Sequence, residues 1–329
     1  MNPRLRVAVV GAGPVLHRYH MPAINAVPEV VRSLVVDADS DRARNTAERY
    51  GFPRWSTDLD DARRFADLAI VLVPNGAHSS VCSELLTQGL PVLCEKPMAR
   101  NEEECVRMIQ ASRRGGALLC VGHNRRFRTH VNIARSFLEH DLIGRLVDVL
   151  AQEGSTSDWP RSSAYFDPAQ SGGGALMDVG IHSIDLIRWF AGEFHEVECD
   201  AKLPAATVES EAQMTFRLAN GARGKLIASR VRDLSQTILF QGERGFVEMG
   251  LWAPSLKIRS ERGKAFQNFR HLEIAESRRP PQDASFVEQL RNFVSSVRGE
   301  QELLVTGEEG LANVAVVCRA YARVTAAAS

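Results

Sequence analysis

The sequence predicts an α/β protein that begins with a doubly wound parallel sheet. Apolar runs of strand length alternate with helix-length segments over the first 123 residues, and the first run leads directly into a glycine pair. In the later part of the chain, apolar and polar residues alternate within short segments that are joined by turn residues, a pattern typical of antiparallel hairpins. A chain of 329 residues is long for one core, so we expect two domains, at 1–123 and 124–329.

The composition excludes several classes of protein. Forty basic residues balance forty acidic ones, which argues against a nucleic acid or a membrane surface as partner. The six cysteines are scattered without a C-x-x-C pair, as is typical of thiols in a reducing compartment. The chain shows no apolar run near the ~20 residues of a membrane span, and no signal-peptide pattern precedes Arg4. We expect a cytoplasmic protein.

The first predicted strand, residues 5–10, ends at Gly11-Ala12-Gly13-Pro14. The glycines allow a tight turn and close approach of a ligand, and Pro14 suits the first helical position. The helix that starts with Pro14 and Val15 would then point its N-terminus at a pyrophosphate. Leu16 stands where the G-x-G-x-x-G pattern has its third glycine, so we expect looser packing of helix on strand. A strand-to-helix turn without a ligand is the alternative.

The second predicted strand, residues 33–37, ends in an acid, Asp37. This carboxylate would accept hydrogen bonds from both hydroxyls of an adenosine ribose and would repel a 2′-phosphate. Residue 38 is alanine rather than arginine, so NAD is favoured over NADP. A turn residue without a ligand is the alternative for Asp37, and Asp39 is a possible substitute.

Two more strand ends carry polar residues. Ligands bind at the carboxyl ends of the strands of a doubly wound sheet. Pro74, Asn75 and His78 follow the strand predicted at 68–73, and Glu95-Lys96-Pro97 follows the strand at 91–94. Pro97 would fix the peptide, possibly as a cis bond, so that Lys96 points into a cleft and donates to a developing alkoxide. An exposed lysine paired with Glu95 is the alternative. The next helix is expected to start after Asn101, with Asn101 as its cap and Glu104 reaching back.

The stretch Gly172–Asp185 is the strongest candidate for chemistry. Asp178, His182 and Asp185 stand at i, i+4 and i+7, so one helix face would carry two carboxylates and an imidazole, which can move protons. Three glycines before this face, and Gly180 within it, indicate the close approach of a ligand or of another backbone segment. A satisfied, half-buried pair is the alternative. A metal site is the weaker idea, because no third and fourth ligand stand at a recognisable spacing.

The second half continues with a helix at 127–140, a strand at 146–152 and a loop at 154–170. Trp159 and Tyr165 lie in this loop and are candidates for a wall of the substrate site, although loop aromatics are more often partly buried covers. Asn220-Gly221 predicts a hairpin turn between two further strands.

Several stretches, in one order, resemble the glucose-fructose oxidoreductase and inositol dehydrogenase family (Gfo/Idh/MocA). They are Gly11-Ala12-Gly13, His20-Met21-Pro22-Ala23, Pro74-Asn75 with His78, Glu95-Lys96-Pro97, Arg126-Phe127, and Gly173-Gly174-Ala175-Leu176-x-Asp178-x-Gly180-x-His182-x-x-Asp185. The resemblance runs from about residue 5 to the C-terminus. It implies an N-terminal Rossmann domain, a C-terminal α/β domain with a large open, mainly antiparallel sheet, and a homo-dimer or homo-tetramer formed through that sheet.

The resemblance also implies roles for residues. Lys96, Asp178 and His182 match the catalytic lysine and the acid-base pair, while Asn75 and Glu95 match positions near the nicotinamide ribose. With the residue arguments above, the predicted cofactor set is Gly11, Gly13, Pro14, Val15, Asp37, Pro74, Asn75, His78, Glu95 and Lys96. The predicted substrate set is Lys96, Arg126, Trp159, Tyr165, Asp178 and His182, and no metal is expected.

The expected activity is the NAD-dependent interconversion of a secondary alcohol and a ketone on a sugar, a cyclitol or a sugar derivative. His182, oriented by Asp178, would take the hydroxyl proton while Lys96 holds the oxygen, and Lys96 as the immediate proton acceptor is the alternative. Two alternatives remain. One is an enzyme that oxidises a sugar transiently, enables an elimination and recycles its cofactor. The other is a nucleotide-sensing regulator without catalysis.

Overall fold

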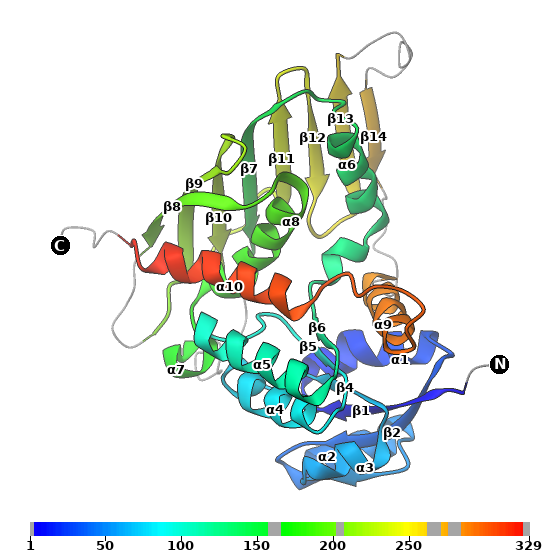
Figure 1. Cartoon of the computed structure of the whole chain (residues 1–329). Helices are drawn as coiled ribbons and strands as arrows, with labels where there is room; N and C mark the ends of the chain where they lie inside the picture. The colour runs from blue at the N-terminus through cyan, green and yellow to red at the C-terminus, as the bar shows by residue number, and fades with distance from the viewer. Residues whose placement is uncertain (1–2, 157–165, 202–206, 262–270, 276–283, 325–329) are drawn as a thin grey trace. The chain divides into compact units, whose positions relative to one another are not determined.

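The computed structural model describes residues 3–156, 166–201, 207–261, 271–275 and 284–324 (Figure 1). It divides the chain into two compact units. The N-terminal unit comprises Met1–Asn124 and Gln282–Val314, and the C-terminal unit comprises Arg125–Pro281 and Ala315–Ser329. The sequence predicts that residues 1–123 bind the dinucleotide and that residues 124–329 bind substrate and form the oligomer, and both roles remain predictions.

The N-terminal unit is built on a six-stranded sheet with the strand order β3-β2-β1-β4-β5-β6. All of its strand pairs are parallel, which confirms the predicted doubly wound sheet. The order reverses direction between β1 and β4, where such sheets bind ligands. The strands are β1 (Leu5–Val10), β2 (Val30–Val36), β3 (Trp55–Ser56), β4 (Leu68–Val71), β5 (Val92–Cys94) and β6 (Leu119–Val121).

Helices cover this sheet, so its central strands are apolar on both faces. Every residue of β4 is fully buried, as is typical of a central parallel strand. Leu16, at the position of the missing third glycine, is also fully buried, and a π-helical turn begins there. The helices of this unit are η1 (Leu16–His20), α1 (Met21–Ala26), α2 (Ser40–Tyr50), α3 (Asp60–Phe65), α4 (Asn75–Thr87), α5 (Glu102–Gly115) and α9 (Ala284–Val297).

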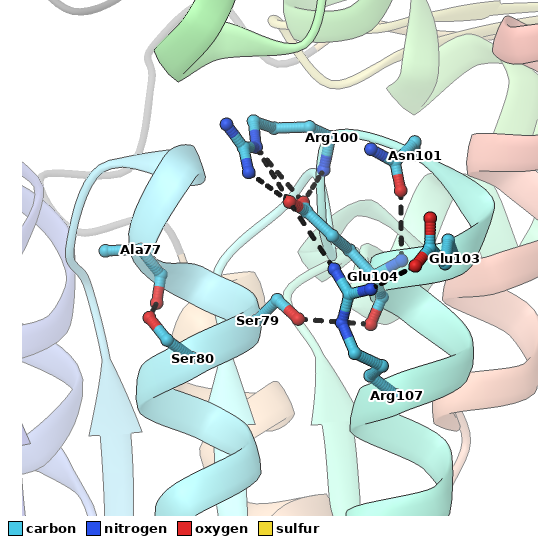
Figure 2. Close-up of polar contacts among 8 residues, drawn as sticks. All are labelled: Ala77, Ser79, Ser80, Arg100, Asn101, Glu103, Glu104 and Arg107. Atoms are coloured by element: carbon cyan, nitrogen blue, oxygen red, sulfur yellow. Dashed lines mark hydrogen bonds and ion pairs between the residues drawn. The ribbon is translucent and has the colours of Figure 1, made fainter.

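The start of α5 fixes the segment that follows Lys96 and Pro97 (Figure 2). Asn101 caps the helix as predicted, because its Oδ1 accepts a hydrogen bond from the Glu104 N–H at 3.0 Å. The Glu104 carboxylate is 3% exposed and reaches back past the cap to accept from the Arg100 N–H at 3.0 Å. It also pairs with the Arg100 guanidinium. The acidic first turn of α5 therefore has a structural role.

The C-terminal unit contains an eight-stranded sheet with the order β14-β13-β12-β11-β7-β10-β9-β8. Only β7 and β10 pair in parallel among these strands, so the predicted mainly antiparallel sheet is confirmed. The predicted hairpin joins β9 to β10, and the Asn220 side chain accepts from the Ala222 N–H at 3.0 Å in its turn. The strands are β7 (Leu146–Gly154), β8 (Phe194–Ala201), β9 (Glu211–Leu218), β10 (Arg223–Ser229), β11 (Thr237–Gly242), β12 (Gly245–Gly250), β13 (Ser255–Ser260) and β14 (His271–Ala275).

Helices pack on one face of this sheet, and the alternation of buried and exposed residues along its strands identifies the residues on that face. Ala212, Met214 and Phe216 of β9 are buried, whereas the intervening residues are partly or fully exposed. The remaining helices are η2 (Asn124–Phe127), α6 (Thr129–Glu139), α7 (Pro168–Ser171), η4 (Leu176–Gly180), α8 (Ile181–Ala191) and α10 (Gly307–Tyr321). Among the described residues, none of the helices has the length and apolar character needed to span a bilayer.

Candidate functional site

The turn after β1 has the geometry of a phosphate-binding turn. Gly11 has a φ of +95°, and an added Cβ there would lie 2.7 Å from the Leu72 carbonyl carbon, so this position needs glycine. An added Cβ at Gly13 would meet no heavy atom within 4 Å in the described part of the chain. Pro14 is exposed and is the first residue of the helix, and Val15 is half-buried. These features fit the predicted approach of a dinucleotide.

Asp37 is 9% exposed at the end of β2 and is tied to the glycine turn. Its Oδ2 accepts from the Ala12 N–H at 2.8 Å, and its Oδ1 accepts from the Asp39 N–H at 2.9 Å. The nearest Arg42 nitrogen lies 3.6 Å from Oδ1. Each carboxylate oxygen has two lone pairs, so Asp37 can still accept from a ribose hydroxyl. Asp39 instead caps α2 by accepting from the Asp41 and Arg42 N–H groups.

Pro74, Asn75 and His78 lie where β4 passes into α4. Pro74 is exposed and Asn75, the first residue of α4, is half-buried. His78 is 1% exposed, and its two ring nitrogens each lie 2.9 Å from a backbone carbonyl oxygen, that of Val73 or that of Pro97. The ring atoms of His78 are therefore used inside the protein, and its predicted contact with the cofactor stays a prediction.

Glu95 and Lys96 follow β5, and the Lys96–Pro97 peptide bond is cis, as the sequence analysis anticipated. The Glu95 Oε1 lies 2.7 Å from the His20 Nε2, and its Oε2 accepts from the Lys96 N–H at 3.1 Å. Burial raises the pKa of the Glu95 carboxyl, but the hydrogen bond and charge of His20, with the charge of Lys96, outweigh burial and hold the pKa below its usual range. Glu95 thus stays ionised beside Lys96, whose side chain is half-buried.

In the C-terminal unit, the predicted catalytic helix starts as a π-helical turn, η4, and continues as α8. π-Turns of this kind occur frequently at functional sites. Asp178 and His182 are both half-buried, but Asp185 is only 1% exposed. The structure therefore corrects the expected polar stripe, because Asp185 does not share the accessibility of the other two.

Asp185 is paired with Arg126, which was predicted to contact substrate. The Arg126 Nη2 lies 2.6 Å from the Asp185 Oδ1, its Nε lies 3.0 Å from Oδ2, and the arginine is 2% exposed. Beside this pair, Arg125 forms a buried ion pair with Glu153, which also accepts from the Ser183 hydroxyl at 3.1 Å. These contacts hold α8 to η2 and to β7. They give Arg126 a structural role, and its contact with substrate remains an untested prediction.

The glycines before η4 make room for the protein itself. An added Cβ at Gly174 would lie 1.9 Å from the Glu209 carbonyl oxygen. The Glu209 side chain is 1% exposed and accepts from the Gly174 N–H at 2.8 Å and the Leu176 N–H at 3.0 Å. Tyr321 of α10 donates its hydroxyl to the same carboxylate at 2.6 Å. Of the two explanations open from the sequence, close approach of another backbone segment accounts for Gly174. A buried carboxylate therefore caps the turn that carries Asp178.

Arg230 contacts Asp178 directly. It follows β10, is 5% exposed, and its Nη2 lies 3.0 Å from the Asp178 Oδ2. Gly180 lets the same turn lie close to β10, because an added Cβ would meet the Ala228 Cβ and Leu226 Cδ2 at 3.3 Å. The guanidinium thus forms an ion pair with one oxygen of the Asp178 carboxylate.

Sequence reasoning missed four residues of this arrangement: His20, Glu209, Arg230 and Tyr321. His20 carried a signal, since it belongs to one of the stretches that support the resemblance. The other three lie far along the chain from the residues they contact, so local spacing gave no indication of them. Trp159 and Tyr165, predicted to line the substrate site, lie outside the described residues. Within the described residues, no group of three or more His, Cys, Asp or Glu side chains could hold a metal ion.

Comparison with known proteins identifies the class. A family model described as "Oxidoreductase family, NAD-binding Rossmann fold" matches residues 5–123, and one described as "GFO/IDH/MocA C-terminal domain" matches residues 131–248. A levoglucosan dehydrogenase from Pseudarthrobacter phenanthrenivorans is 28% identical over 271 residues, which cover 69% of this chain and 67% of the relative. A myo-inositol 2-dehydrogenase from Thermotoga maritima is 23% identical over 320 residues, which cover 93% of this chain and 92% of the relative.

Solved structures show the same fold. Levoglucosan dehydrogenase in complex with NADH and levoglucosan has a TM-score of 0.86 at 22% identity, covering 97% of this chain and 98% of that one. The aldose-aldose oxidoreductase of Caulobacter crescentus, complexed with glycerol, has a TM-score of 0.87 at 22% identity, covering 97% of each chain. With the glycine turn, Asp37 and the parallel sheet, these matches define an NAD-binding oxidoreductase of the dehydrogenase class. The chain belongs to the GFO/IDH/MocA family.

Proposed function

We propose that the protein interconverts a secondary alcohol and a ketone on a sugar, a cyclitol or a sugar derivative. The observation that carries the proposal is the arrangement on η4 and α8. Asp178 and His182 stay accessible while Asp185 is buried, and Arg230 fixes one oxygen of Asp178. Relatives named levoglucosan dehydrogenase, myo-inositol 2-dehydrogenase and D-glucoside 3-dehydrogenase support a polyhydroxylated substrate.

When bound, NAD would supply the acceptor for the hydride of the carbinol carbon. His182 takes the hydroxyl proton, and Asp178 orients the imidazole and offsets the charge that develops on it. The Lys96 ammonium donates a hydrogen bond to the substrate oxygen as negative charge grows there. In the reverse direction, His182 returns the proton to the same oxygen.

The proposed cofactor contacts come from the ends of four strands. Gly11, Gly13, Pro14 and Val15 would lie at the pyrophosphate, and Asp37 would accept from the adenosine ribose, which favours NAD over NADP. Asn75 and Glu95 would lie near the nicotinamide ribose. The ionised state of Glu95 suits this role, because a carboxylate accepts hydrogen bonds from hydroxyl groups.

We also propose that the uncovered face of the large sheet joins two or four copies of the chain. Leu150 of β7 is 37% exposed on the face opposite the buried Val149 and Ala151, and a large apolar side chain in the middle of a sheet face fits an interface.

The test follows NADH absorbance with NAD, and then NADP, over inositols, free sugars, sugar phosphates and nucleotide sugars. We expect turnover with NAD that falls about 100-fold or more in His182→Ala and in Lys96→Met, because each variant loses a proton-transfer or oxyanion contact. A matched control is His140→Ala, which changes an exposed residue outside the proposed site and should keep full activity.

NADH affinity, followed by its fluorescence, separates the alternatives. Variants that bind NADH but do not turn over support the assigned chemistry. Full turnover in both site variants would contradict it. Product formation without accumulated NADH would indicate the cofactor-recycling enzyme instead, and tight NADH binding with no turnover on any substrate would favour the regulator.

A further inference from the structure

His78 joins two strand ends through its ring. It lies in the first turn of α4 and is 1% exposed. Its Nε2 is 2.9 Å from the carbonyl oxygen of Val73, just after β4. Its Nδ1 is 2.9 Å from the carbonyl oxygen of Pro97, just after β5. The ring therefore bridges the two loops that carry Asn75 and Lys96.

The two acceptors determine the number of protons on the ring. A carbonyl oxygen accepts hydrogen bonds and cannot donate one, whereas a neutral imidazole has a single N–H. In either neutral tautomer, one ring nitrogen would direct its lone pair at a carbonyl oxygen 2.9 Å away, in a buried site. An unmade hydrogen bond in such a site is costly. Only the imidazolium, with two N–H groups, satisfies both contacts.

We propose that His78 is an imidazolium at neutral pH and that its two N–H groups hold the ends of β4 and β5 in register, which makes it a positioning residue for Lys96 and Asn75. The part of the proposal that concerns Lys96 rests on the function proposed above. The charge state of His78 does not.

The surroundings of the ring oppose and favour this charge in identifiable ways. Burial lowers the pKa of His78, while the charge and hydrogen bond of Cys94 and the carbonyl oxygens of Pro97 and Val73 raise it, to about 9. Burial also raises the pKa of the Cys94 thiol well above its usual range, so Cys94 is a neutral thiol at pH 7 and the two carbonyl oxygens are the groups that favour the charge on His78. The start of α4 also opposes a cation, because a helix N-terminus carries partial positive charge. The other titratable groups that are buried or half-buried on these elements are Cys82 on α4, Cys94 and Glu95 at β5, Lys96 after it, and Glu104 and Cys105 on α5.

A buried charge at this place has a geometric consequence. Pro97 follows Lys96 directly, and Val73 lies two residues before Asn75, so both predicted cofactor-side groups are attached to carbonyls that His78 fixes. Glu104 holds the far side of the same segment through the Arg100 N–H, as Figure 2 shows. A neutral side chain at position 78 would release one of the two strand ends.

The direct test is NMR of the full chain labelled with ¹⁵N-histidine, without substrate. We expect one histidine, assigned as His78 by loss of its signals in His78→Gln, to carry protons on both ring nitrogens at pH 7 and pH 8. It should lose one near pH 9. A Cys94→Ser variant, which alters a neighbouring atom, provides the assignment if His78→Gln does not fold. A ring nitrogen of His78 without a proton at pH 7 would overturn the proposal.

The positioning role has its own measurement. In His78→Gln we expect kcat to fall about 10- to 100-fold while NADH affinity, measured by fluorescence, changes less than threefold, since displacement of a reacting group by about 1 Å has effects of this size. In the conservative Cys94→Ser variant, both quantities should stay near wild type. Turnover at the wild-type rate in His78→Gln would overturn the positioning role. The NMR result does not depend on turnover, so it distinguishes failure of this proposal from failure of the proposed reaction.

Discussion

Each unit contains a short glycine run that leads into a helix beginning with a π-helical turn, yet the space left by the glycines is used differently. After β1, an added Cβ at Gly13 would meet no described heavy atom within 4 Å. Before η4, an added Cβ at Gly174 would lie 1.9 Å from the Glu209 carbonyl oxygen. The first run leaves room that fits a ligand, and the second is filled by a carboxylate of the protein.

This difference shows what a glycine run does and does not indicate. Both runs place backbone N–H groups at the start of a helix, where negative charge is stabilised. In the N-terminal unit, that fits the phosphates of the cofactor. In the C-terminal unit, the Glu209 carboxylate accepts from these N–H groups, while Asp178 and His182, to which we assign the proposed chemistry, stay half-buried.

A side chain at position 174 should disrupt the contacts of Glu209 before η4. Gly174→Ala should lower the free energy of unfolding by about 3 kcal/mol or more, because the new Cβ would meet backbone and displace Glu209 from the N–H groups that it accepts from. Urea unfolding measures the change. The matched variant is Gly13→Ala, which should leave stability within about 0.5 kcal/mol but weaken NAD binding by roughly 10-fold. Equal stability losses in the two variants would contradict the comparison.

The strands and turns that the sequence predicted were those with a local signal. Apolar runs gave β1, β4, β5 and β6, but β3, with only Trp55 and Ser56, is too short to show a period. The sequence predicted that Asp178 and His182 share a face, and both remain accessible. It could not predict that Asp185 leaves that face, because its partner Arg126 is 59 residues away and nothing in the spacing indicates the pair.

The same limit applies to the residues that hold the site. Glu209 and Tyr321 lie 112 residues apart, and Arg230 lies more than 50 residues after Asp178. Each of these residues makes its contact only in the folded chain. Local patterns therefore identified the groups that fit the chemistry, while long-range packing decided which of them are accessible and which are fixed.

The proposed His78 cation joins the strand ends in the N-terminal unit, whereas the Glu209 carboxylate holds the helix start in the C-terminal unit. The pKa of His78 is raised from 6.5 to about 9. Its stabilising effect should be fully present below about pH 6.5 and be lost as the pH rises through about 9, at roughly 1.4 kcal/mol per pH unit and up to about 3 kcal/mol in total.

Urea unfolding of the wild type and of His78→Gln between pH 6 and pH 9.5 measures this loss. The difference in stability between the two proteins should shrink as the pH rises. An exposed-site variant, His140→Gln, should differ from the wild type by a constant amount. A difference for His78→Gln that stays constant over the same range would contradict the assigned charge.

The Tyr321 hydroxyl donates one of the hydrogen bonds that the Glu209 carboxylate accepts. Burial and the charge of Glu209 raise the pKa of Tyr321 well above its usual range, so its hydroxyl is a hydrogen-bond donor at neutral pH. Tyr321→Phe removes this donor but keeps the ring and both backbone N–H groups on Glu209. It should lower the free energy of unfolding by about 1–2 kcal/mol, since the lost hydrogen bond involves a charged acceptor.

Glu209→Gln should cost more than Tyr321→Phe in the same urea experiment. The amide nitrogen of glutamine would face a donor, so one backbone N–H or the tyrosine hydroxyl would lose its acceptor. In both variants, NADH affinity should stay unchanged, because neither residue belongs to the N-terminal unit. If Glu209→Gln were as stable as the wild type, the carboxylate could not be the group that fixes the start of η4, and the glycine run there would need a ligand after all.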